Sequence, residues 1–164
     1  MKKQAIGLTI LIIAFFLGAC ATIRTAPSAS RPLRCNLDAV AELKDRNITL
    51  PCLSANEIDD YLRNSPDWKL IARINGKLDH GAAYIAARSR KAIVVTYNSR
   101  NAKRSGHIAV VSGHKPMAYS PSFGTDVPYA WGSVNGADPE LTLLSYQFSA
   151  DKEPYMNYYV YVGQ

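Results

Sequence analysis

The residues of this sequence that are best suited to nucleophilic chemistry are its cysteines and histidines, three of each. Cys35 opens the segment CNLDAVAELKDR, in which apolar residues recur at helical spacing, so its thiol is predicted to lie in the first turn of a helix. Unpaired N–H groups and the dipole at a helix start stabilise a thiolate and lower its pKa. Cys35 is therefore the predicted nucleophile, and Cys52, which also precedes a predicted helix, is its rival.

His107 is the histidine placed to act on such a thiol. It follows Gly106 and opens the apolar run HIAVVS, which is typical of a buried strand. An imidazole at a strand edge beside a thiol on a helix can take the thiol proton, so that the thiolate attacks a carbonyl carbon. The helix N–H groups can then help to hold the oxyanion. His107 is therefore the predicted general base and acid, whereas His80 and His114 are predicted to be surface residues.

Other roles remain open for the same residues. Cys35 and Cys52 can form a structural disulfide outside the cytoplasm, which would remove the nucleophile. His107 can also be an ordinary strand-edge histidine. No group of His, Cys, Asp and Glu in the sequence has metal-ligand spacing, and no glycine-rich phosphate loop is present. We therefore expect neither a metal nor a cofactor.

The start of the chain is typical of an export signal. A basic start is followed by an apolar run from Ala5 to Phe16, which is shorter than the ~20 residues of a membrane-spanning helix. Leu17-Gly18-Ala19-Cys20 then resembles the bacterial lipobox. This resemblance implies removal of residues 1–19 and acylation of the Cys20 thiol, with several acyl chains giving a stable anchor. Ala21 after the cysteine, rather than Asp, implies outer-membrane sorting, with the domain in the periplasm.

The rest of the chain is expected to hold a tether and one domain. Residues 20–32 are rich in small residues and proline, which is typical of a flexible tether, and residues 33–164 suit a single domain. The net charge of +6 becomes +4 without Lys2 and Lys3. An exported, mildly basic protein is not expected to bind nucleic acid. Acidic partners outside the cytoplasm include peptidoglycan stem peptides and anionic lipid head groups. The oligomeric state is not predicted.

The order of predicted elements indicates the α+β class, with N-terminal helices packed on an antiparallel sheet. Ser54 and Glu57 form a capping box at the start of the second helix. Helices are expected within residues 35–46, 54–64 and 78–88, and extended segments at 68–74, 92–97, 107–112, 116–120, 141–149 and 155–162.

Two short motifs carry a family resemblance. The run from Gly106 to Val111, GHIAVV, resembles the Gly-His-Val-Ala-Val-Val strand of CHAP and NlpC-type cell-wall cysteine amidases. Cys35-Asn36 is similar to the cysteine end of that pattern. The resemblance spans roughly residues 35–162. It implies a minimal papain-like domain that cuts amide bonds in peptidoglycan peptides, with Cys35 as nucleophile and His107 as general base and acid.

The third catalytic residue is where the sequence departs from the pattern. These families usually carry a polar residue one strand further on, which orients the histidine. In the corresponding segment, MAYSPSFGTD, the side chains available for this role are Ser120, Ser122 and Asp126, with Tyr119 nearby.

Two functions are therefore expected from the sequence. The first is a lipid-anchored cysteine amidase or peptidase acting on peptidoglycan stem peptides, whose carboxylates can pair with Arg100, Lys103 and Arg104. The second is a non-catalytic envelope lipoprotein that binds peptidoglycan or a partner protein and has a Cys35–Cys52 disulfide. The redox state of Cys35 distinguishes them.

Overall fold

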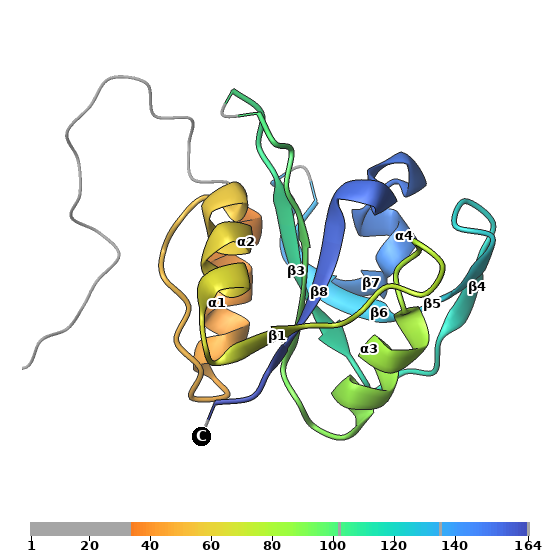
Figure 1. Ribbon diagram of the computed structural model, residues 1–164, viewed down its shortest axis with the longest axis horizontal. Coiled ribbons are helices and arrows are strands. Elements are labelled where there is room, and N and C mark those ends of the chain that lie inside the picture. Colours follow the sequence, from red (N-terminus) through yellow and green to blue (C-terminus); the bar gives the residue numbers. More distant parts are fainter. Residues whose placement is uncertain (1–33, 102, 135, 164) are drawn as a thin grey trace, which may run out of the picture.

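The computed structural model describes residues 34–101, 103–134 and 136–163 (Figure 1). The predicted signal peptide of residues 1–19, the lipidation site Cys20 and the tether of residues 20–32 lie outside the described residues, and so does the side chain of Cys35. In the part of the chain that is described, no helix is long and apolar enough to cross a membrane.

The described chain is a mixed α+β structure, as the sequence predicts. Its helices are α1 (Arg34–Lys44), α2 (Ala55–Asn64), α3 (His80–Arg88), α4 (Leu144–Gln147) and the 3₁₀ helix η1 (Ala150–Tyr155). Its strands are β1 (Trp68–Leu70), β2 (Ile93–Tyr97), β3 (His107–Ser112), β4 (Ala118–Ser120), β5 (Thr125–Val127), β6 (Tyr129–Gly132), β7 (Glu140–Leu143) and β8 (Met156–Tyr161). The capping box of Ser54 and Glu57 is confirmed at the start of α2.

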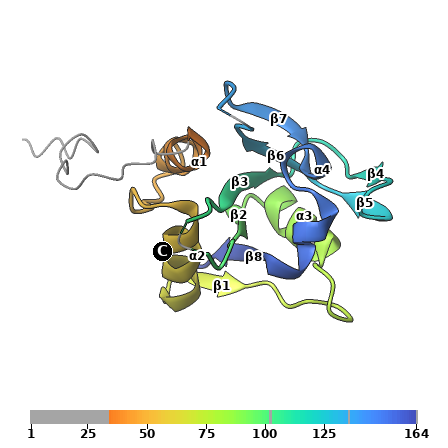
Figure 2. The ribbon, with the colours of Figure 1, turned by 90° about the horizontal axis from the view of Figure 1, so that it is seen from above.

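Six strands form one antiparallel sheet in the order β1-β8-β2-β3-β6-β7. β2 and β3 lie at its centre, and their register pairs Tyr97 with His107 and Val94 with Val110. β4 and β5 form a separate two-stranded sheet on the side of the molecule away from α1 and α2 (Figures 1 and 2).

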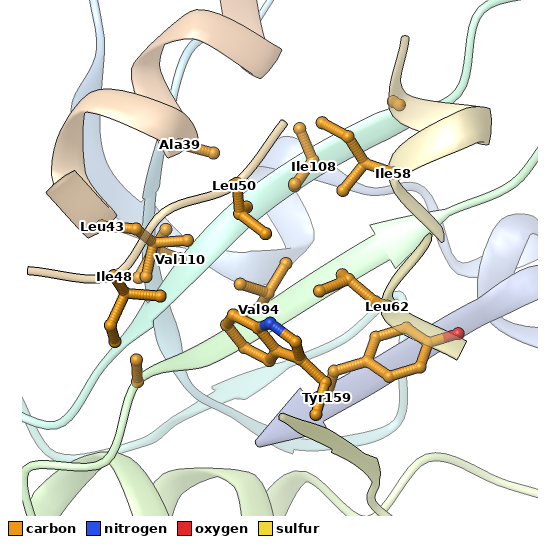
Figure 3. Close-up of a cluster of buried hydrophobic side chains, with 13 residues drawn as sticks. Ala39, Leu43, Ile48, Leu50, Ile58, Leu62, Val94, Ile108, Val110 and Tyr159 are labelled. Atoms are coloured by element: carbon orange, nitrogen blue, oxygen red, sulfur yellow. The ribbon is translucent and has the colours of Figure 1, made fainter. Parts of the chain in front are cut away.

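Each face of the large sheet is covered by a different pair of helices. α1 and α2 lie on one face, and α3 and α4 lie on the other (Figure 2). Because successive side chains of a strand point to opposite faces, β3 sends Ile108 and Val110 to the first face and Ala109 and Val111 to the second. The cluster under α1 and α2 is shown in Figure 3 and includes Ala39, Leu43, Ile58, Leu62, Val94, Ile108, Val110 and Tyr159.

The second cluster is built from α3, α4 and the segment around β5. Its members include Leu78, Ala83, Ile93, Val95, Ala109, Val111, Phe123, Val127, Ala130, Leu144, Phe148, Met156 and Tyr158. The buried members of both clusters lie between residues 39 and 159. The chain after the predicted tether therefore contains its own core, and we expect it to fold without the lipid anchor.

Several segments differ from the prediction. The expected extended segment 68–74 contains only the short strand β1, and the strands β5 and β6 were not expected. Residues 141–149 were expected to be extended throughout, but the strand β7 ends at Leu143 and the short helix α4 follows. The backbone N–H of Leu144 donates to the carbonyl of Pro128 at 2.9 Å, so α4 begins against the chain entering β6. This turn brings Gln147 and Phe148 under the sheet instead of along its edge.

Candidate functional site

The first turn of α1 carries Cys35, because α1 begins at Arg34. This backbone position is the one that the sequence predicts. The next residue, Asn36, is 5% exposed, and its Nδ2 donates to the carbonyl oxygen of Leu53 at 2.9 Å. The start of α1 is therefore joined to the chain that enters α2.

The start of α2 in turn contacts the start of β3. Gly106 precedes His107, and a Cβ built on it would meet the Tyr97 carbonyl oxygen and would lie 2.5 Å from Asn56 Oδ1 and 3.3 Å from the Ala55 Cβ. Glycine is required here because the backbone leaves no room for a side chain. Through Leu53, Ala55 and Gly106, the first turns of α1 and α2 and the start of β3 gather at one end of the sheet.

Asn56 also fixes the loop between β2 and β3. Its Nδ2 donates to Ser99 Oγ at 2.9 Å and to the Arg104 carbonyl at 3.1 Å, and its Oδ1 accepts from the Ser99 N–H at 3.0 Å. The basic side chains Arg100, Lys103 and Arg104 on this loop are exposed, as the sequence predicts. They therefore place positive charge beside the start of β3.

His107 occupies the first position of β3 and is half-buried. Strand alternation sends its side chain to the face of Ala109 and Val111, where its ring centroid lies 4.7 Å from that of Phe148. α1 packs on the opposite face. The structure thus brings Cys35 and His107 to the same end of the sheet, with the His107 ring turned to the α4 face.

Burial lowers the pKa of His107 to about 4, although a hydrogen-bonding interaction with Gln147 opposes this shift. The imidazole is therefore neutral at pH 7, which is the form that accepts a proton from a thiol.

This shift makes folding stability depend on pH. The unfolded chain binds a proton near pH 6.5, whereas the folded chain binds it only near pH 4. Above pH 6.5, the neutral His107 therefore stabilises the folded chain by about 3 kcal/mol in the free energy of unfolding. This stabilisation is lost as the pH falls to 4. Urea unfolding at pH 7 and pH 4.5 should show this loss. His107→Gln should reduce it, whereas the exposed control His114→Gln should not. Equal pH dependence in the His107→Gln variant and the wild type would contradict the account.

The polar neighbour of His107 is Gln147, which the sequence did not suggest. Gln147 is the last residue of α4 and is 8% exposed. Its Nε2 donates to the Ala130 carbonyl at 2.7 Å and to Thr142 Oγ1 at 3.0 Å. Its Oε1 and the His107 Nε2 are both buried, and neither atom makes a hydrogen bond of normal geometry. In the sequence, Gln147 lies in a run of alternating apolar residues that indicates a strand.

The three residues expected to orient His107 lie on the small sheet or beside it. Ser120 is the last residue of β4 and is buried, with its Oγ 3.1 Å from that of Ser122 and accepting from the Phe123 N–H at 3.4 Å. Asp126 is exposed on β5. These hydrogen bonds of Ser120 lie within the β4–β5 hairpin, and Gln147 occupies the position beside the histidine.

Cys52 is disulfide-bonded. The other two cysteines of the chain are Cys20 and Cys35, whose side chains lie outside the described residues. The hydrogen bond between Asn36 and Leu53 joins the residues that follow Cys35 and Cys52. A Cys35–Cys52 pair therefore fits this geometry, and Cys52 itself does not carry a free thiol in this state.

The two remaining histidines differ from each other. His114 is exposed, as predicted, but the prediction that His80 lies on the surface is wrong. His80 is 6% exposed, its Nδ1 is 2.8 Å from the Tyr158 hydroxyl, and its ring packs edge-on against Phe123. The apolar face of α3 carries it into the second cluster. Across the described ranges, no group of three His, Cys, Asp or Glu residues is arranged to hold a metal ion.

No family model matches the chain, and no curated protein is significantly similar to it.

Proposed function

We propose that the protein is a lipid-anchored outer-membrane hydrolase whose papain-like domain cuts amide bonds in peptidoglycan peptides. The observation that carries the proposal is a buried, neutral His107 with Gln147 beside it, at the end of the sheet where the first turn of α1 begins. A thiol, an imidazole and a side-chain carbonyl acceptor are the groups that thiol amidases combine.

The chemistry follows from these groups. His107 accepts the proton of the Cys35 thiol, and the thiolate attacks the carbonyl carbon of the scissile amide. The N–H groups at the start of α1 stabilise the oxyanion of the tetrahedral intermediate. As the C–N bond breaks, His107 gives its proton to the leaving amine and a thioester remains. Water, activated by His107, then hydrolyses the thioester and restores the thiol.

The loop between β2 and β3 supports a substrate rich in carboxylates. Its exposed cations, Arg100, Lys103 and Arg104, flank the start of β3 and are held on a loop that Asn56 fixes. Guanidinium groups bind carboxylates through paired hydrogen bonds. Stem peptides carry free carboxylates, so this loop is the expected contact for the part of the substrate next to the cut.

A second function is favoured by the disulfide of Cys52. If its partner is Cys35, the protein in this state is oxidised and has no nucleophile. It then either requires reduction before it can act or serves as a non-catalytic envelope lipoprotein that binds peptidoglycan or a partner protein.

The test uses the chain from Ala21 onward, in which Cys35 and Cys52 are the remaining cysteines. Purified peptidoglycan is incubated with this protein with and without reductant, and soluble products are identified by mass spectrometry. We expect the reduced protein to release fragments whose masses show hydrolysis of one amide bond in the stem peptide. Co-sedimentation with intact peptidoglycan and no fragments under either condition would reject the hydrolase and support the binding protein.

A further inference from the structure

We propose that an open groove between α2, the start of β1 and residues 47–51 binds a short, neutral saccharide chain. The groove consists of two adjoining hollows of about 640 Å³ and 380 Å³, which share Tyr61 and Asp67. Both volumes fall in the range of about 300–1,000 Å³ that is typical of small-molecule sites. Because the groove does not use the Cys35 thiol or His107, the proposal applies equally to a hydrolase and to a non-catalytic lipoprotein.

One wall of the groove is the exposed face of α2. Its side chains follow the i, i+3, i+4, i+7 spacing that places residues on one side of a helix: Glu57, Asp60, Tyr61 and Asn64. α2 ends at Asn64 because Pro66 disfavours helical backbone in the residue before it. The Ser65 N–H closes the last turn by donating to the Tyr61 carbonyl at 2.9 Å. This wall therefore offers an aromatic ring between carboxylate and amide groups.

The opposite wall is the segment that leads from α1 to α2. Ile48 and Leu50 are buried, and the residues that alternate with them, Asn47, Thr49 and Pro51, line the groove. The Ile48 N–H donates to the carbonyl of Leu43 on α1 at 2.9 Å, which fixes the start of the segment. This wall adds an amide and a hydroxyl, and each of these groups can both donate and accept hydrogen bonds.

The floor of the groove lies where β1 begins. Trp68 and Tyr161 pair across β1 and β8, and their ring centroids lie 5.2 Å apart in an edge-to-face arrangement. The Asp67 backbone is fixed here, because its carbonyl accepts from the Val162 N–H at 2.8 Å and its own N–H donates to Ser65 Oγ at 3.3 Å. Together with the ring on α2, three aromatic side chains therefore line a groove whose frame is held by the sheet.

These groups match the chemistry of a sugar. Sugar rings carry hydroxyl groups, which donate and accept hydrogen bonds, around apolar C–H faces, which pack on aromatic rings. The amide, carboxylate and hydroxyl groups of the walls satisfy the first requirement, and the three aromatic side chains satisfy the second. Because two hollows adjoin, we expect the site to hold at least two sugar rings.

The charge of the groove favours a neutral ligand over a cationic one. Glu57 accepts a hydrogen bond from the N–H of the α2 N-cap at 2.9 Å and lies at the positive end of the helix dipole. Asp60 lies three residues before Arg63, a spacing at which opposite charges on a helix are neighbours, although Arg63 also pairs with Asp59. Among the described residues that line the groove, Asp67 is then the carboxylate with neither form of compensation. One such charge is too little to select a polycation.

The test records ¹H–¹⁵N spectra of the chain from Ala21 onward during titration with chitotetraose, cellotetraose and tetralysine. We expect at least one of the two sugars to shift the amide signals of residues 47–51 and 57–68, and added salt should not weaken the effect, because a neutral ligand is not screened. Shifts with chitotetraose alone identify an acetamido sugar, such as the glycan of peptidoglycan, and shifts with both sugars identify recognition through hydroxyls. No shift with either sugar at about 10 mM, or groove shifts with tetralysine alone, would overturn the proposal.

Two variants locate the sugar in the groove. Tyr61→Ala should weaken binding on the order of tenfold, because the sugar loses an aromatic contact. Tyr119 is exposed on β4, so Tyr119→Ala is the matched control and should leave binding unchanged. Thr49→Arg fills the groove from the opposite wall, and it carries the test if the Tyr61 variant does not fold. Sugar binding that persists unchanged in the folded groove variants would contradict this location of the site.

Discussion

Cys35→Ala is expected to abolish hydrolysis of peptidoglycan peptides, and Cys52→Ser is expected to leave the protein active without reductant. Removing the nucleophile of a hydrolase lowers kcat on the order of 10⁴-fold or more, because neither the oxyanion donors nor the base can replace the attacking atom. Removing Cys52, which is exposed and disulfide-bonded, instead leaves the Cys35 thiol without a disulfide partner in the chain from Ala21 onward.

The two variants control for each other. If Cys52 pairs with Cys35, each substitution removes the same disulfide, whose short loop contributes about 3 kcal/mol to stability. Both variants should therefore unfold at the same lower urea concentration, while only one loses activity. Hydrolysis by Cys35→Ala, or its absence in Cys52→Ser while that variant remains folded, would contradict the assignment of the nucleophile.

The second large effect is expected at Asp59, which is fully buried on α2. Its Oδ1 accepts hydrogen bonds from Thr96, from Asn157 at 3.1 Å and from the Tyr159 hydroxyl at 2.9 Å. Its Oδ2 accepts from Arg63 at 3.1 Å and from Asn98 at 3.3 Å. One carboxylate thus joins α2 to β8 and to the end of β2, from which the loop beside the site departs.

Asp59→Leu should cost about 3–5 kcal/mol in the free energy of unfolding, because it leaves several buried donors without an acceptor. The neighbouring Asp60 is exposed, so Asp60→Leu is the matched control and should change stability by less than about 0.5 kcal/mol. Urea unfolding at pH 7 measures both. Similar losses in the two variants would show that the hydrogen bonds of Asp59 do not stabilise α2 on the sheet.

Asp59 also contributes to the acid sensitivity of the fold. Burial alone raises the pKa of its carboxyl, but hydrogen bonds from Thr96, Tyr159, Asn157 and Arg63 outweigh burial and hold the pKa below its ordinary value of 3.8. The folded chain therefore binds this proton less readily than the unfolded chain. The stabilisation is present above the unfolded pKa and is lost as the pH falls through the folded pKa. As the pH falls, the stabilisation from Asp59 is therefore lost after the stabilisation from His107, whose loss begins at a higher pH.

The part of the fold that the sequence predicts best is the part with strong local signals. A capping box marks the start of α2, and the apolar run HIAVVS gives β3 its observed bounds. α1 also begins where its apolar spacing indicates, which places the Cys35 backbone in a first turn. In these segments, local preference and tertiary packing favour the same structure.

The position of Gln147 beside His107 could not be predicted, for the opposite reason. α4 has four residues and no side-chain cap, and the alternating run LTLLSYQFS favours a strand over its whole length. Its position is set by the hydrogen bond from Leu144 to Pro128, a contact with the chain that enters β6. β6 itself is a short YAWG segment after a proline and was also missed. Gln147 therefore reaches His107 through tertiary contacts that no local pattern encodes.

The same limit applies to the faces of the sheet. Sequence spacing places His107 at a strand start and Cys35 at a helix start, but it does not say which face each side chain meets. The register of β3 turns His107 to the face of Ala109 and Phe148, while α1 covers Ile108 and Val110. The helix that carries Cys35 and the His107 ring therefore lie on opposite faces of the sheet, at the end where Gly106 precedes β3.

The most direct test of the central claim is the titration of the Cys35 thiol in the Cys52→Ser chain from Ala21 onward. A limiting alkylating agent is applied across a pH series, and modification of Cys35 is measured by mass spectrometry, with His107→Gln as the comparison. An activated nucleophile should be alkylated with an apparent pKa well below the ordinary thiol value of about 8.5, and His107→Gln should change that value. A Cys35 that titrates near 8.5 in both proteins would contradict the hydrolase and leave the binding lipoprotein as the function of this chain.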